Sequence, residues 1–152
     1  MSKQYTSNLM MVRPASFQFN IETAVSNAFQ KSLDGLTAEE IKQKAIEEFD
    51  NFVTLLRSNG IQVVVANDTD SPVKPDAIFP NNWISFHEDA SIVTYPMNAP
   101  VRRLERSEAI INQIKQEFSI KNRHALENSE SENIFLEGTG SMIIDRPNQI
   151  VY

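Results

Sequence analysis

The sequence contains no cysteine among its 152 residues, and this absence excludes several kinds of site. Disulfide scaffolds, thiolate zinc sites and thiol nucleophiles all need a cysteine side chain, so this chain alone builds none of them. Only four glycines occur, where average usage predicts on the order of ten. Neither a P-loop nor a dinucleotide-binding fingerprint, both rich in glycine, is found.

Basic clusters and long apolar runs are also missing. The 14 Lys and Arg residues against 20 Asp and Glu residues give a net charge of −6, which repels nucleic-acid phosphates. No segment approaches the roughly 18 consecutive apolar residues of a membrane helix, and residues 1–30 do not resemble a signal peptide. We therefore expect a cytoplasmic protein that binds neither nucleic acid nor a membrane.

The composition that remains, with 41% hydrophobic residues, is typical of one globular domain over residues 1–152. The apolar run Leu9–Val12 predicts a strand that ends before Pro14. Residues 21–30 have mixed polarity and fit either a short helix or an ordered loop. The β-branched run Ile61–Ala66 predicts a strand that is covered on both faces.

A helix is predicted between these two strands. Thr37 and Glu40 form a capping box at its start, and Asn59-Gly60 supplies a left-handed stop. Its apolar residues recur at helical spacing and define one face: Ile41, Ala45, Phe49, Phe52 and Leu56. We expect this face to lie on the core.

The rest of the chain predicts two hairpins and a second helix. The hairpins comprise residues 84–95 and residues 141–152. The helix carries an apolar face made of Leu104, Ile111, Ile114 and Phe118. Shorter extended segments are expected at 77–79 and 134–136, with a bend at 138–140. A unit of strands plus one helix is thus used about twice, which predicts an α/β or α+β layer fold.

The last predicted hairpin ends abruptly at Tyr152. Natural domains rarely stop inside a core strand, so we expect the sequence to be part of a longer one. A closely trimmed terminus is the alternative.

Polar residues and prolines interrupt the apolar pattern in three segments where a ligand could bind. In residues 75–83, Pro80 breaks the strand and leaves Asn81 and Asn82 beside Phe79 and Trp83, which suits a small planar polar ligand. The alternative is that the two amides cap a turn.

Arginines and one carboxylate mark the other two segments. Arg102 and Arg103 are placed at the start of the second helix, where the helix dipole disfavours cations, so they could instead grip a substrate carboxylate. A solvated surface pair with Glu105 is the alternative. Glu137 precedes two close glycines and could orient a cationic or N–H-rich group, although such a residue is often a solvated turn residue.

Neither histidine has a pattern that indicates catalysis. His87 and His124 are expected at the surface, because one is next to a polar turn and the other is in a polar stretch. No HExxH, His/Asp/Glu cluster or G-x-S-x-G motif occurs. We therefore expect no metal and no cofactor.

Five strings of the sequence resemble, in order, the N-terminal half of the arginine deiminase-related hydrolases of the amidinotransferase superfamily. They are MMVRPASFQFN, PDAIFPNNWISFH, YPM, RRLER and FLEGTGSMIIDR. The branch that acts in citrulline utilisation is the most similar. The resemblance implies a pentein fold, in which five strand-and-helix modules surround a central active-site channel. This chain would supply about two modules and the start of a third.

The resemblance also implies roles for individual residues. Asn82 and Glu137 fall where deiminases place their two substrate-gripping acidic groups. Phe79 would line the channel, and Asp76 would contact the substrate. Either Arg102 or Arg103 would hold the substrate carboxylate. Family members attack the guanidino or ureido carbon with a cysteine.

Two departures from the family pattern alter what is expected. Asn82 replaces a carboxylate, and an amide matches a neutral ureido group better than a guanidinium. The catalytic cysteine and the family histidine are both missing. We therefore expect the N-terminal part of a hydrolase that acts on citrulline- or arginine-like amino acids. The alternatives are a non-catalytic amino-acid-binding module, and a half-subunit that pairs with itself or with a separate C-terminal half.

The chain by itself is expected not to hydrolyse citrulline, because it has no thiol nucleophile. The measurement is the release of ornithine or ammonia after the purified chain is mixed with citrulline. Robust turnover would contradict this expectation.

Overall fold

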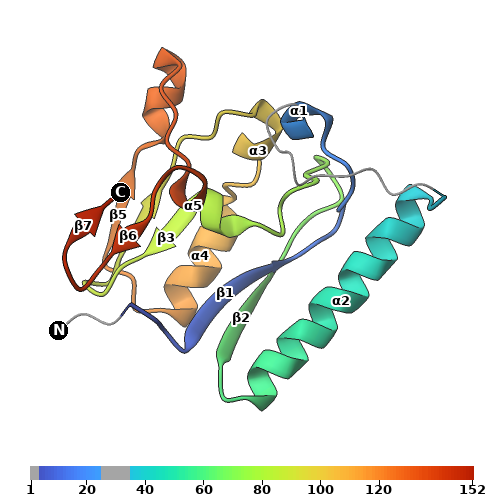
Figure 1. The fold of residues 1–152 in the computed structure, drawn as a ribbon, viewed down its shortest axis with the longest axis horizontal. Coiled ribbons are helices and arrows are strands. Elements are labelled where there is room, and N and C mark those ends of the chain that lie inside the picture. Colours follow the sequence, from blue (N-terminus) through green and yellow to red (C-terminus); the bar gives the residue numbers. More distant parts are fainter. Residues whose placement is uncertain (1–3, 25–34) are drawn as a thin grey trace.

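A computed structural model describes residues 4–24 and 35–152 of the chain (Figure 1). Its strands are β1 (Asn8–Arg13), β2 (Gln62–Asn67), β3 (Ile84–Phe86), β4 (Ser91–Thr94), β5 (Asn122–Ala125), β6 (Ile144–Asp145) and β7 (Ile150–Val151). Its helices are α1 (Ile21–Ala24), α2 (Ala38–Ser58), α3 (Pro100–Arg103), α4 (Glu108–Glu117) and α5 (Gly138–Ser141), with 3-10 helices η1 (Pro80–Asn82) and η2 (Glu127–Glu132).

The strands form three small sheets, which confirms the mixed α+β class. β1 and β2 are parallel, from Asn8 opposite Gln62 to Arg13 opposite Asn67. β4 lies between β3, which is antiparallel to it, and β5, which is parallel to it. β6 and β7 form a hairpin. In the described residues no sheet closes into a barrel, and the unit of strand, helix and parallel strand occurs twice, around α2 and around α4.

The capping box predicted at the start of α2 is confirmed in both directions. The backbone N–H of Glu40 donates to Thr37 Oγ1 at 3.2 Å, and the N–H of Thr37 donates to Glu40 Oε2 at 2.8 Å. The helix ends at Ser58 with Asn59 as its C-cap, and Gly60 follows with a positive φ of 80°. This left-handed conformation favours glycine and turns the chain into β2.

The strand β2 is covered on both faces, as its continuous apolar run predicts. Val63 packs with Phe49 and Val53 of α2 on one face. Ala66 belongs to the larger core cluster, which includes Ile111 of α4 and Trp83. Figure 1 shows α2 and α4 on opposite sides of the β1–β2 pair.

The predicted buried face of α2 is wrong at Phe52. This side chain is 51% exposed, whereas Val53 is 5% exposed and Phe49 is 4% exposed. Phe49 and Val53 are one helical turn apart and point at β2 together. The position of the neighbouring sheet therefore decides which side of the apolar stripe is covered.

The second predicted helix is two helices instead of one. Pro100 occupies the first turn of α3, where its missing N–H is tolerated, and α4 begins only after Ser107. Leu104 lies between them and is 50% exposed, so its assignment to the apolar face is wrong. Arg102 and Arg103 form the last turn of α3, where the helix dipole favours cations. The dipole argument for an unusual placement is therefore also wrong.

Four shorter assignments need correction. Residues 77–79 belong to a turn region, residues 134–136 form no strand, and residues 138–140 lie in the single-turn helix α5. The strand β5 lies in a polar stretch where none is expected. It forms because β4 offers it a parallel edge, which the local sequence does not reveal. Of the undecided stretch 21–30, residues 21–24 form α1 and the remainder lies outside the described residues.

Both predicted hairpins are confirmed, and the turn of the second one includes Gln149 with a positive φ of 57°.

Within residues 4–24 and 35–152, no helix has the length and apolar character needed to cross a membrane.

Ile111→Ala is expected to lower the free energy of unfolding by about 2–5 kcal/mol, because Ile111 is fully buried in the larger core cluster and its loss leaves a cavity. Phe52→Ala is the matched control and should cause a clearly smaller loss, although it removes a larger side chain. Urea denaturation of both variants gives the comparison. Equal losses would contradict the assignment of the core.

Candidate functional site

Asn82, Glu137 and Arg102 meet at one place although they are distant in the sequence. Asn82 Nδ2 donates to Glu137 Oε2 at 3.4 Å. Arg102 Nη1 lies 3.9 Å from the same carboxylate oxygen, and Arg102 Nε lies 3.9 Å from Asp76 Oδ2. Four of the six residues predicted to bind substrate or act in catalysis are therefore neighbours.

Two short helical turns bring Asn82 and Glu137 together. Asn82 ends η1, and Glu137 is the residue directly before α5. A Cβ added to Gly138 would lie 2.6 Å from the backbone oxygen of Asn81, so only glycine permits this approach. Thr139 Oγ1 also donates to the oxygen of Asn81, at 3.1 Å. The Glu-Gly-Thr-Gly string thus holds Glu137 against η1.

Arg102 is a buried cation at the centre of this cluster. Its Nε and Nη2 donate to the two carboxylate oxygens of Glu105 at 2.9 and 3.0 Å, and Nη2 donates to the oxygen of Phe79 at 3.2 Å. Burial alone would lower the pKa of Arg102, but its bonds to Glu105 and the nearby carboxylates raise it above the ordinary value. The pair with Glu105 is buried, so the interpretation as a solvated surface pair is wrong.

Glu105 is buried more deeply than the other carboxylates of the cluster. Burial raises its pKa to about 7, even though the hydrogen bonds from Arg102 act in the opposite direction. No functional role is predicted for Glu105 from the sequence. The sequence feature that could have indicated a role is the position of Glu105 three residues after Arg102. This spacing places both side chains on one side of a helical turn.

Asp76 is held by residues from the N-terminal part of the chain. Asn20 Nδ2 donates to Asp76 Oδ2 at 2.6 Å, and Thr23 Oγ1 donates to the same oxygen at 3.3 Å. Asn20 is only 2% exposed, and its Oδ1 accepts the backbone N–H of Glu22. Sequence reasoning missed Asn20. An asparagine just before a helix was the available signal, and it indicates only a cap.

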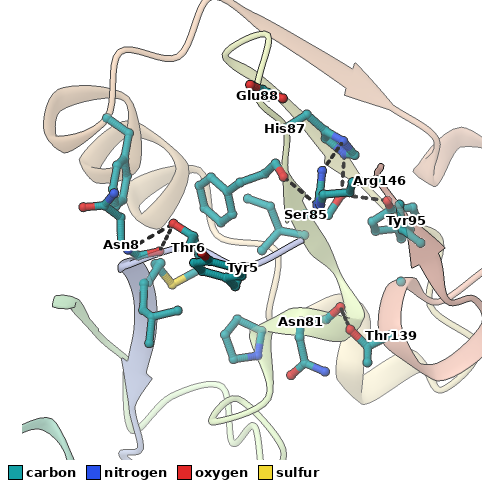
Figure 2. Close-up of a pocket in the computed structure, with 18 of the residues that line it drawn as sticks. Tyr5, Thr6, Asn8, Asn81, Ser85, His87, Glu88, Tyr95, Thr139 and Arg146 are labelled. Atoms are coloured by element: carbon teal, nitrogen blue, oxygen red, sulfur yellow. Dashed lines mark hydrogen bonds between the residues drawn. The ribbon is translucent and has the colours of Figure 1, made fainter. Parts of the chain in front are cut away.

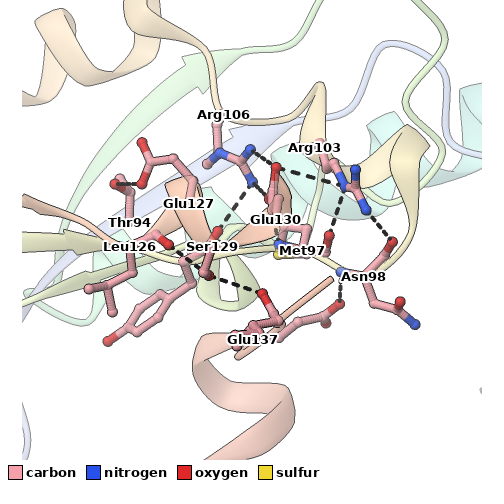
Figure 3. Close-up of polar contacts among 12 residues, drawn as sticks. Thr94, Met97, Asn98, Arg103, Arg106, Leu126, Glu127, Ser129, Glu130 and Glu137 are labelled. Atoms are coloured by element: carbon pink, nitrogen blue, oxygen red, sulfur yellow. Dashed lines mark hydrogen bonds and ion pairs between the residues drawn. The ribbon is translucent and has the colours of Figure 1, made fainter. Parts of the chain in front are cut away.

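Arg103 belongs to a neighbouring network, in which its Nε lies 3.8 Å from Glu130 Oε2 (Figure 3). It donates to the backbone oxygens of Met97 and Asn98 at 2.9 and 3.1 Å, and its guanidinium lies 5.3 Å from the centre of the Phe135 ring. The N–H of Asn98 in turn donates to Glu137 Oε1 at 3.3 Å. Arg103 and Glu137 are therefore linked through one backbone segment.

The two aromatic residues predicted to flank the amides have different environments. Trp83 is fully buried in the larger core cluster, so it offers no wall to a ligand and that expectation is wrong. Phe79 is 47% exposed. The difference arises because Trp83 directly precedes β3 and points into the core, whereas Phe79 precedes η1.

His87 is half-buried, which corrects its expected surface position, whereas His124 is exposed. His87 Nε2 lies 2.8 Å from Ser85 Oγ, which lies 2.7 Å from Tyr95 Oη (Figure 2). Burial and the nearby Arg146 lower the pKa of His87. Among the described residues, no three His, Asp or Glu side chains group as a metal site would require.

The raised pKa of Glu105 predicts a decline in stability as the pH rises. Between the ordinary value of 4.5 and about 7, the folded chain holds a proton that the unfolded chain has lost. The free energy of unfolding should therefore fall across this range, by at most about 1.4 kcal/mol per pH unit. Glu105→Gln should flatten this part of the profile, measured by urea denaturation at several pH values.

Glu117→Gln is the matched control, because Glu117 is exposed at the end of α4. It should leave the slope unchanged. The same slope in Glu105→Gln and in the unmodified chain would show that another group is responsible.

Residues 13–152 match the family described as N,N dimethylarginine dimethylhydrolase, eukaryotic. A search of curated proteins found no significant match.

Three solved structures of ArgZ, an arginine dihydrolase of cyanobacteria, have a similar fold. The apo structure has a TM-score of 0.65 and 16% identity, covering 95% of this chain and 19% of that one. The product-bound N-terminal domain has a TM-score of 0.65 and 16% identity, and the match covers 95% of this chain and 46% of that one. A variant of that domain, covalently bound to a reaction intermediate, has a TM-score of 0.66 and 15% identity. The match covers 95% of this chain and 47% of that one.

The chain thus spans less than half the length of these structures, and identities this low establish the fold alone. The family match covers nearly the whole sequence, and the α+β fold agrees with it. The chain therefore belongs to the eukaryotic N,N dimethylarginine dimethylhydrolase family, within the pentein-type arginine-related hydrolases.

Proposed function

We propose that this chain forms the substrate-gripping part of a hydrolase that cleaves a carbon–nitrogen bond in the ureido or guanidino group of a free amino acid. The observation that carries this proposal is the contact of Asn82 with Glu137, beside the buried Arg102. The family match supports the reaction class.

Asn82 and Glu137 together suit a planar group with both N–H donors and an oxygen acceptor. Glu137 can accept N–H groups, and Asn82 can accept an N–H group or donate to a carbonyl oxygen. In the described part of the chain, Asn82 Oδ1 has no hydrogen-bond partner, so it is available to a ligand. A neutral ureido group, as in citrulline, uses all of these contacts.

A guanidinium would be matched less well by this pair. It has only donors, and its charge favours two ionised carboxylates over one carboxylate and an amide. The name of the family refers to a substituted arginine. The preference for citrulline-like over arginine-like substrates therefore does not come from the family name. It rests on the amide of Asn82.

The carboxylate of the substrate is assigned to Arg103 in preference to Arg102. The fork of Arg102 is already occupied by Glu105, and only 8% of its side chain is exposed. The side chain of Arg103 is 31% exposed, and its Nη1 makes no hydrogen bond within the described residues. Phe79 and Asp76 keep their proposed roles as a channel wall and a substrate contact.

The bond-breaking step requires groups that these residues do not supply. In the proposed reaction a cysteine thiolate attacks the ureido carbon, the carbon–nitrogen bond breaks, and ammonia or an amine leaves with a proton. Water then hydrolyses the S-carbamoyl intermediate, which restores the thiol and releases a carbamate that decomposes to carbon dioxide and the remaining amine or ammonia. Because the sequence has no cysteine, we propose that residues 1–152 form the N-terminal portion of a single catalytic domain. A C-terminal half or a second subunit would complete its active site. We propose the cytoplasm as its location.

A second candidate function is that of an amino-acid-binding module. It is favoured by the same absence of cysteine combined with an intact cluster of Asn82, Glu137 and Arg102. Such a module would bind its ligand tightly without a partner, whereas part of an open channel should bind weakly.

Citrulline is expected to bind more tightly than arginine, and Asn82→Asp should reverse the order. The substitution would replace an amide by a carboxylate next to Glu137, which favours a guanidinium by about tenfold or more. The measurement is the NMR shift of backbone amides near Asn82 and Glu137 during titration with each amino acid. Dissociation constants in the millimolar range indicate a partial site, and micromolar values indicate a binding module.

Asn128→Asp is the matched control, because it adds the same charge at an exposed residue of η2. It should leave the order of the two ligands unchanged. If neither amino acid shifts the amides near Asn82, the proposed site is refuted.

A further inference from the structure

The two glycines of α5 have different surroundings. A Cβ at Gly138 would lie 2.6 Å from the backbone oxygen of Asn81, so the contact between α5 and η1 itself requires a glycine there. Figure 2 shows that the next residue, Thr139, bonds to the same segment at Asn81. Gly138 therefore has a structural role in holding α5 against η1.

No such structural requirement applies to Gly140. Among the described glycines, a positive φ occurs at Gly35 and Gly60 but not at Gly140, so other residues can adopt its backbone conformation. The three atoms that would lie nearest to a Cβ at Gly140 all belong to side chains. Gly140 is also exposed, and alanine favours a helical turn more than glycine does. The fold itself would therefore accept alanine at this position.

The side chains next to Gly140 are the two that form the candidate site. A Cβ at Gly140 would lie 2.9 Å from Asn82 Nδ2 and 3.4 Å from Glu137 Oε2. These two atoms are the ones joined by the hydrogen bond of the site. A carbon at 2.9 Å from the amide nitrogen is closer than van der Waals contact allows, whereas 3.4 Å is an ordinary contact. A side chain at position 140 would therefore displace the amide of Asn82 and leave the carboxylate of Glu137 in place.

The position of this amide decides which planar group suits the site. A carboxylate only accepts hydrogen bonds, so Glu137 keeps Nδ2 of Asn82 turned toward itself. Asn82 then adds a donor and an acceptor beside the acceptors of Glu137, which together match a ureido group. Without the amide, Glu137 offers acceptors alone, and these suit a guanidinium.

We infer that Gly140 is a positioning residue for Asn82 and thereby determines specificity. Its lack of a side chain leaves the Asn82 amide against Glu137, so that the pair favours a ureido group over a guanidinium. The inference rests on the function proposed above for this pair. It adds that the selectivity depends on the residue at position 140 as well as on the amide itself.

Gly140→Ala tests the positioning of the amide without any ligand. The NMR signals of the Asn82 side-chain amide should shift, while the free energy of unfolding in urea should be unchanged or slightly higher. Glu137→Gln should shift the same signals in the unmodified chain, and clearly less when it is combined with Gly140→Ala. Asn82 signals that do not respond to Gly140→Ala, or a clear loss of stability, overturn the inference.

Titration with citrulline and arginine tests the specificity. Gly140→Ala should weaken the binding of citrulline about three- to tenfold, as expected for one lost hydrogen bond, and that of arginine clearly less. Equal losses for the two amino acids, or no loss for citrulline, overturn the inference. If the unmodified chain binds neither amino acid, the proposed function is refuted, and the Asn82 signals alone decide whether residue 140 positions the amide.

Ser58→Thr is the matched control, because it adds one methyl group at an exposed residue of another helix, α2. It should leave the Asn82 signals and the ratio of the two affinities unchanged. Changes as large as those of Gly140→Ala would show that the effect is not local to the site and would also overturn the inference.

Discussion

The neutralisation of one buried cation organises this region of the molecule. Arg102 is 7% exposed and is surrounded by Glu105, Asp76 and Glu137, which come from separate segments of the chain. An isolated charge would be very unfavourable in this environment, and removing one partner of a buried pair typically costs about 3–5 kcal/mol. The turn before η1, the end of α3 and the residue before α5 are therefore held in a fixed arrangement.

That arrangement explains why the candidate site is built on turns and not on the strands themselves. Asn82 belongs to η1, and Glu137 lies directly before α5, where Gly138 permits backbone contact. The sheets supply a support whose hydrophobic clusters lie on both faces of β2.

Local signals in the sequence were sufficient for several elements. The capping box of Thr37 and Glu40, the glycine at position 60 and the alternation in β3 and β4 each act within a few residues, and the structure confirms them. The predictions from the sequence are wrong where residues that are distant in the sequence determine the local structure. Leu104 interrupts a helical pattern, and β5 is polar yet pairs with β4, because the neighbouring elements set these outcomes.

The sequence by itself determined the order of most strands and helices, the mixed fold class and the absence of a thiol nucleophile, because these depend on residue type and short-range spacing. Only the tertiary structure decided that Arg102 is buried against Glu105 while Arg103 turns to Met97 and Asn98. The reason is that burial and charge pairing are set by segments tens of residues apart, whose approach no local pattern specifies.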